Sequence, residues 1–125
     1  MLLKSWLCAF VAIGAAQNAL AAGNSLAGKS KFGACSMCHG AEGKGTPMAP
    51  PLKGVVGREA GSVAGFAYSS AMRGSGIVWN DQHLSAFITH PQAVVKGTRM
   101  AFPGKADPKD VADIVAYLNT LRTKD

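Results

Sequence analysis

The chain has 125 residues, of which 48% are hydrophobic and 16% are charged, and this length and composition favour one small globular domain. Its formal net charge of +6 comes from scattered cations without a basic run or a basic helix face, which argues against nucleic acid as a partner. A mild excess of positive charge suits acidic protein partners instead.

The first 21 residues have the pattern of a secretory signal peptide. An early cation, Lys4, is followed by an apolar run and by the small-residue end Ala19-Leu20-Ala21. We expect cleavage after Ala21, which leaves residues 22–125 as a single domain exported to the periplasm. The alternative is a retained membrane anchor, but the apolar run is shorter than the roughly 20 residues that span a bilayer.

The first half of the domain is predicted to contain little regular structure. Residues 23–32 show a weak helical pattern, whereas residues 40–57 are rich in Gly and Pro and predict a long surface loop. A loop of this length is uncommon in a compact domain unless it wraps around something. A short helix is predicted from Ser69 to Arg73, where Gly74 ends it.

Two clearer helices follow. The segment "NDQHLSAFITHP" predicts a helix that Asn80 caps and that stops before Pro91. After the loop "KGTRMAFPG", a final helix begins with Asp107 as N-cap and Pro108 at its first position, and apolar residues recur at helical spacing as far as Leu121. No segment has the pattern of a strand, so the predicted fold class is all-α with long loops.

One motif match is misleading. "GNSLAGKS", residues 23–30, fits the phosphate-binding pattern G-x-x-x-x-G-K-[ST]. That motif requires a buried strand before it, so that backbone amides face the phosphates. Here the predicted signal peptide precedes it and no sheet follows, so we interpret the match as chance.

The segment "CSMCH" carries the strongest functional signal. Cys35 and Cys38 are separated by two residues, and His39 follows directly. The spacing could serve a redox pair, half of a zinc site or covalent attachment of haem. A redox pair of the thioredoxin type would need a βαβ context, and zinc would need two more ligands, for which only His83 and His90 remain. C-x-x-C-H is the pattern of haem attachment, because two thiols can bond to one porphyrin while the next imidazole reaches the iron.

Haem iron takes a sixth ligand or keeps an open position. The candidates in this sequence are Met37, Met48, Met72, Met100, His83 and His90. Most buried methionines simply fill a core. Met100 differs because it lies in a loop bounded by Gly and Pro, which can bring its sulfur to the iron. The two histidines suit solvent-facing or capping positions.

With these motifs in order, residues 26–122 resemble a class I c-type cytochrome of the mitochondrial-type branch, such as a bacterial soluble cytochrome c. The resemblance is carried by "CSMCH", "PPLKGVVGR", "GFAYSSAMRGSGIVW", "LSAFITHP", "GTRMAF" and "DIVAYL". It implies a small cytochrome c fold, with four to five helices and long loops wrapped around one covalent haem c.

The resemblance also implies roles for individual residues. Cys35 and Cys38 would form the two thioether bonds, His39 would be the proximal ligand and Met100 the distal ligand. The carbonyl of Pro50 would accept a hydrogen bond from the His39 imidazole. The residues implied as contacts of the haem propionates are Arg58, Tyr68, Trp79 and Thr98. The residues implied between the first and last helices are Gly28, Phe32, Ile114 and Tyr117.

Two departures from the family pattern stand out. Phe32 precedes Cys35 by three residues, one fewer than usual, and the segment from His39 to Pro50 is also one residue shorter. In addition, Phe87 occupies a position where many relatives carry tyrosine.

The expected function is electron transfer by a monomeric, non-enzymatic carrier that exchanges electrons with an acidic oxidase, reductase or dehydrogenase, and that meets membranes only through such partners. Five cations are candidates for a basic rim that steers a partner: Lys44, Lys53, Lys96, Arg99 and Lys105. The alternative interpretation, that they form an ordinary solvated surface, fits the sequence equally well. One alternative is a dedicated subunit of a larger dehydrogenase or oxidase. A small haem peroxidase or gas sensor is a further alternative, which would need an open or labile sixth position.

Overall fold

The computed structural model describes residues 23–122, so the predicted signal peptide and its cleavage site lie outside the described residues. The helices in chain order are α1 (Ser25–Lys31), α2 (Gly33–His39), the 3₁₀ turn η1 (Ala41–Gly43), α3 (Ser70–Arg73), α4 (Asp81–Thr89), α5 (Pro91–Val94) and α6 (Pro108–Thr120). Residues 23–122 contain no strand, and only two isolated bridges. The all-α prediction is confirmed. Among these residues, no helix is both long and apolar enough to cross a bilayer.

The helix caps predicted at Asn80 and Asp107 are present, and Ser69, which was predicted as the first helical residue, is instead the N-cap of α3. The side chains of Ser69, Asn80 and Asp107 each accept a hydrogen bond from a backbone N–H in the first turn of α3, α4 and α6 respectively. Pro108 begins α6, and Gly74 follows the last residue of α3. Capping residues identify these boundaries because their side chains satisfy amides that the helix itself leaves free.

Two short helices were not predicted. α2 follows α1 after a break at Phe32, and its sequence GACSMCH has no apolar periodicity that would indicate a helix. α5 starts at Pro91, where the sequence pattern indicates only the stop of the preceding helix. Proline fits this place because the first helical position needs no backbone donor.

The false phosphate-binding motif lies within a helix. Gly28 and Ser30 are inside α1, and Asn24 caps that helix through a bond from the Ala27 N–H. The segment is therefore not a strand-to-helix loop, as the motif would require.

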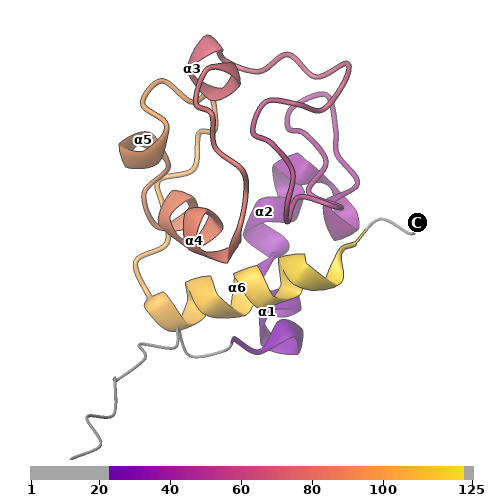
Figure 1. The fold of residues 1–125 in the computed structure, drawn as a ribbon. Helices are drawn as coiled ribbons and strands as arrows, with labels where there is room; N and C mark the ends of the chain where they lie inside the picture. The colour runs from indigo at the N-terminus through magenta and orange to yellow at the C-terminus, as the bar shows by residue number, and fades with distance from the viewer. Residues whose placement is uncertain (1–22, 123–125) are drawn as a thin grey trace, which may run out of the picture.

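α1 crosses α6 at close range, and α4 also packs on α6 (Figure 1). Gly28 is buried in this crossing, and the Phe32 and Tyr117 rings lie 5.0 Å apart between their centroids. Trp79, Leu84, Phe87, Ile114 and Leu118 belong to the same continuous core. This frame supports the loop-rich half of the molecule, where residues 44–69 contain no helix.

Candidate functional site

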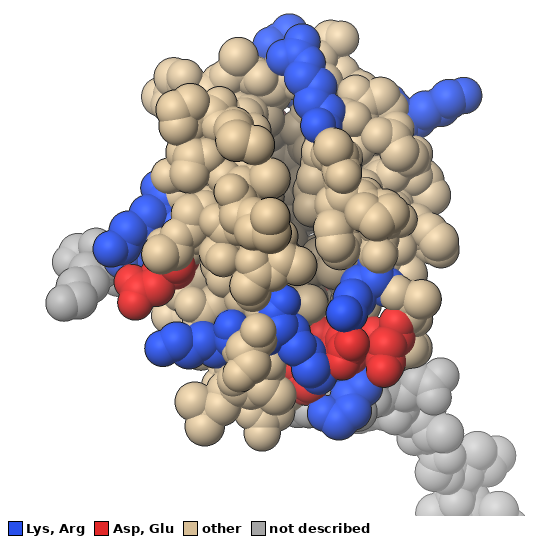
Figure 2. Space-filling view, turned by 180° about the vertical axis from the view of Figure 1, so that it is seen from behind, with Lys and Arg blue, Asp and Glu red and all other residues tan. Residues whose placement is uncertain are grey.

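A largely apolar cavity of about 540 Å³ lies between α2, α4, α6 and the segments that connect them. Seen from behind, the molecule is hollowed between two uncharged masses (Figure 2). All nine residues predicted for the site line the cavity: Cys35, Cys38, His39, Pro50, Arg58, Tyr68, Trp79, Thr98 and Met100. They come from positions up to 65 residues apart in the sequence. The fold therefore brings into one cavity the residues that the family resemblance implied for one site.

His39 is held by a backbone acceptor. It is the last residue of α2, is buried, and its Nδ1 lies 2.7 Å from the Pro50 carbonyl oxygen. A carbonyl can only accept, so Nδ1 carries the proton and a neutral ring leaves Nε2 unprotonated. Burial lowers the pKa of His39, which favours this neutral form. The His39 ring is therefore held in one orientation, and its Nε2 has a free lone pair that can bind a metal ion.

The loop after α2 is folded back onto the end of that helix. The Gly45 N–H donates to the His39 carbonyl at 2.7 Å, and the Thr46 hydroxyl donates to the Cys38 carbonyl. Thr46 and Ala49 also pair through their backbones at 3.0 Å. These bonds bring the Pro50 carbonyl within hydrogen-bonding distance of the imidazole, although the segment is one residue shorter than the family pattern.

Cys35 and Cys38 are unpaired thiols on the cavity wall. Cys35 is half-buried, and burial raises its pKa, whereas Cys38 is exposed. They lie on successive turns of α2, directly before His39. Two thiols at one rim of an apolar cavity can both bond to a single flat group inside it.

The sulfur candidates differ in exposure. Met37 and Met48 lie at the cavity rim with 81% and 73% of their surface exposed, whereas Met72 and Met100 are partly buried and pack against the core. The N–H of Met100 donates to the Thr98 hydroxyl oxygen at 3.3 Å. Neither histidine candidate lines the cavity, and His83 Nδ1 lies 2.8 Å from the Val78 carbonyl oxygen.

Arg58 supplies a positive charge to the cavity. Its Nη2 donates to the Pro51 carbonyl at 2.6 Å, and it takes part in none of the ion pairs formed within residues 23–122. Burial lowers its pKa, because the charged form loses solvent. A partly buried cation without an anion favours an anionic ligand group.

Two hydroxyl groups add to this donor set. The Tyr68 oxygen accepts from the Val63 N–H at 3.2 Å, and the Thr98 oxygen accepts from the Met100 N–H. Each hydroxyl retains a proton that it can donate. With the apolar walls, the thiols and the imidazole, these residues fit a flat apolar macrocycle that carries carboxylates, which is the chemistry of haem.

Two supports of the site were not predicted from the sequence. The Gln92 amide donates to the Thr98 carbonyl at 2.9 Å and accepts from the Gly97 N–H at 3.0 Å. Phe66 stacks edge-on against Tyr68, with 4.8 Å between the ring centroids. No motif marks Gln92, because an exposed glutamine beside a proline has many ordinary uses.

The basic rim is partly neutralised. Lys105 Nζ lies 3.3 Å from Asp110 and Lys44 Nζ lies 3.9 Å from Glu42, whereas Arg99 donates to the Ala67 carbonyl at 3.1 Å. Lys53 and Lys96 enter none of the ion pairs between described residues. Basic side chains lie above and below the hollow rather than along its sides (Figure 2).

The fold and the site define a class I c-type cytochrome. Residues 21–122 match the model of the cytochrome c family, and the chain belongs to that family. Its members are electron carriers rather than enzymes, and they contain haem.

Individual relatives agree with this assignment. The chain is 49% identical to cytochrome c of Tetrahymena pyriformis, over 79% of this chain and 90% of that protein. It is 45% identical to cytochrome c2 of Rhodopila globiformis, over 80% and 95% respectively. The structure of cytochrome cH from Methylobacterium extorquens superposes with a TM-score of 0.74 at 43% identity, covering 78% of this chain and 99% of that one.

Proposed function

We propose that this protein is an exported, monomeric electron shuttle with one haem c, attached through Cys35 and Cys38 and ligated by His39 and Met100. The observation that carries the proposal is the convergence of these four residues on one apolar cavity, with the His39 Nε2 left free by the bond to Pro50. The bound haem iron supplies a one-electron couple, and methionine ligation raises its potential.

The chain's own residues keep this couple reversible. The Pro50 carbonyl fixes the His39 ring and increases its basicity. The apolar walls of the cavity would limit water around the bound iron and favour its less charged ferrous state. Arg58, Tyr68 and Thr98 provide the charge and the hydroxyl groups that would hold the propionates. With His39 and Met100 both holding the iron, the bound haem would supply electron transfer without exchange of ligands.

The alternatives of a peroxidase or a gas sensor require an open iron position. The half-buried Met100 on the cavity wall argues against one. The signal-peptide pattern of residues 1–21 supports export. We further propose acidic redox proteins as partners, because the chain has a net positive charge.

The test is to make the protein with a c-type haem attachment system and examine the purified product. We expect haem that resists extraction by acidified acetone, the weak far-red band of methionine-ligated ferric haem, and a reversible one-electron titration. The variant Cys35→Ala/Cys38→Ala should release its haem on extraction. Extractable haem in the unsubstituted protein would contradict covalent attachment, and a ferric spectrum without the far-red band would contradict methionine ligation.

A further inference from the structure

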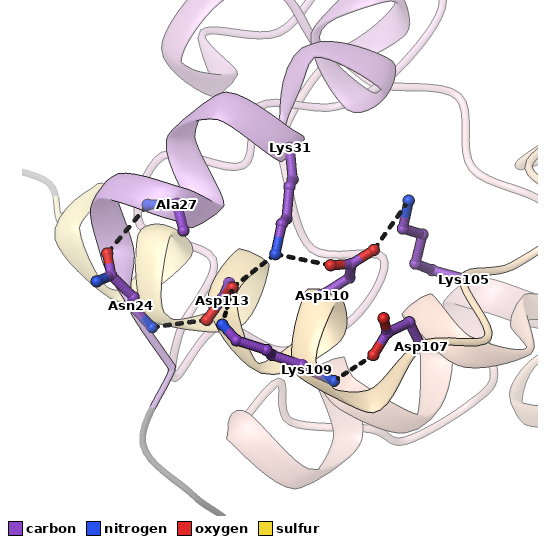
Figure 3. A network of polar contacts seen from close by, with 8 residues as sticks. All are labelled: Asn24, Ala27, Lys31, Lys105, Asp107, Lys109, Asp110 and Asp113. Carbon is purple, nitrogen blue, oxygen red and sulfur yellow. Dashed lines mark hydrogen bonds and ion pairs between the residues drawn. The ribbon is translucent and has the colours of Figure 1, made fainter.

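Asp110 joins three parts of the fold (Figure 3). Its Oδ1 lies 2.6 Å from Lys31 Nζ in the last turn of α1, and its Oδ2 lies 3.3 Å from Lys105 Nζ. Asp110 itself is in the first turn of α6, and its side chain is 23% exposed. Hydrogen bonds from Lys31 above all, and from Lys105, lower the pKa of Asp110, so the carboxylate is charged at neutral pH.

Lys105 ends the segment of residues 97–105, called here the Met100 segment, which leads into α6. Its Lys105 end is bonded to the end of α4. The Lys105 N–H donates to the Ile88 carbonyl at 2.9 Å. Gly104 has a φ of 107°, and a Cβ there would lie 2.2 Å from the Thr89 carbonyl oxygen. Only glycine allows this approach. The Lys105 end is therefore held to α4 by its backbone and to α6 by the Lys105 side chain.

The other end of the segment is held by Gln92, through its bonds to Gly97 and Thr98. Between the two anchors, the backbone N–H groups of Ala101 and Phe102 find no acceptor within residues 23–122. Met100 itself bonds to Thr98 through its N–H, but the stretch that follows it has no backbone bonds of its own among the described residues and depends on the anchors on either side.

We propose that Asp110 is a positioning residue for Met100, acting through Lys105 to hold the Met100 segment against the α1–α6 helix pair. The inference rests on the proposed ligand role of Met100. Asp110 does not touch the cavity, so its effect would reach the iron only through the segment.

The neighbouring carboxylate provides the contrast. Asp113 accepts from the Asn24 N–H at 2.8 Å, from Lys31 Nζ at 2.7 Å and from Lys109 Nζ at 3.0 Å, and all three donors lie in or next to α1 and α6 (Figure 3). None of these contacts reaches the Met100 segment. Lys109→Met, which removes an exposed partner of Asp113, is therefore a matched control from the same network.

The experiment measures two quantities on the haem-loaded protein: hydrogen exchange of the Lys105 amide, which donates to Ile88, and the rate at which ferrous protein binds carbon monoxide. Asp110→Asn and Lys105→Met should each increase both by roughly two- to fivefold, the range of an exposed ion pair. In the Asp110→Asn background, Lys105→Met should increase neither the amide exchange nor the rate of carbon monoxide binding any further. Lys109→Met should change neither quantity, and Met100→Ala serves as the reference for an open site.

The outcomes separate this inference from the proposed function. If Met100→Ala binds carbon monoxide readily while Asp110→Asn behaves like the unsubstituted protein, Met100 is the ligand and the positioning role of Asp110 is wrong. If Asp110→Asn speeds amide exchange but neither Asp110→Asn nor Met100→Ala changes carbon monoxide binding, the ion pair holds the segment but Met100 is not the ligand. That result overturns the inference together with the proposed ligation.

Discussion

Gly28 in α1 meets the backbone of Asp113 in α6 with no room for a side chain. A Cβ at position 28 would lie 1.8 Å from the Asp113 carbonyl oxygen and 2.9 Å from the Tyr117 Cβ. The crossing of the first and last helices therefore requires glycine at position 28, because any side chain would clash with the backbone of α6.

We expect Gly28→Ala to destabilise the protein by at least ~1–3 kcal/mol, the usual cost of overpacking a tight site. Its matched control is Gly33→Ala, where a Cβ meets no atom within 4 Å at the start of α2. This control should be neutral or stabilising by up to ~1 kcal/mol, because alanine is the better helix former. Urea unfolding of both haem-loaded variants measures the difference. Equal midpoints for the two variants would contradict the close packing of α1 on α6.

Acid should unfold the protein in part through Asp113. Hydrogen bonds from Lys31, the Asn24 N–H and Lys109 lower the pKa of Asp113 well below its ordinary value of 3.8. A depressed folded-state pKa gives stability that is present above pH 3.8 and is lost as the pH falls toward the folded value. We expect Asp113→Asn to lower stability at pH 7 and to flatten its decline below pH 5, as measured by denaturant unfolding across pH. Glu59→Gln, which neutralises an exposed carboxylate that enters none of the ion pairs between described residues, is the control variant.

Met100→Ala should keep the haem attached but open the sixth position. The ferrous variant would then bind carbon monoxide readily, whereas the unsubstituted protein would bind it slowly. Met72→Ala is the control, because Met72 is the other partly buried methionine on the cavity wall. If Met72→Ala rather than Met100→Ala opened the site, the proposed distal ligand would be wrong.

Phe87→Tyr should raise the reduction potential modestly. The buried Phe87 ring lies 5.1 Å from that of Trp79 between centroids, and Phe87 and Met100 line the same cavity. A hydroxyl that donates to the Met100 sulfur would withdraw electron density and stabilise ferric iron less. Potentiometric titration decides this, and haem content should stay the same. A lowered potential with intact methionine ligation would show that the added hydroxyl does not withdraw electron density from the Met100 sulfur.

Electron exchange with an acidic redox protein should slow as salt rises, since screening weakens steering. We expect Lys53→Gln and Lys96→Gln to reduce the low-salt rate more than Lys44→Gln, because Glu42 already offsets part of the charge of Lys44. Stopped-flow rates at several ionic strengths measure both effects. Rates that do not depend on salt would mean that the cations only solvate the surface.

The sequence by itself predicted the elements that depend on local chemistry. The caps at Asn80 and Asp107 were recognisable because a capping side chain bonds to amides two or three residues away. Likewise, the two thiols and the imidazole of "CSMCH" are adjacent, so their chemistry could be inferred without knowledge of the fold. The family resemblance added the distant residues of the site, all of which line one cavity.

Only the tertiary structure decided the contacts between segments far apart in the chain. α2 lacks an apolar pattern and is helical beside the cavity, and α5 begins at a proline that also ends α4. The Gln92 clamp and the Lys31–Asp110–Lys105 network join residues with no shared motif. A charged side chain has many possible partners along a sequence. Packing selects among them, because it fixes which atoms come within hydrogen-bonding distance.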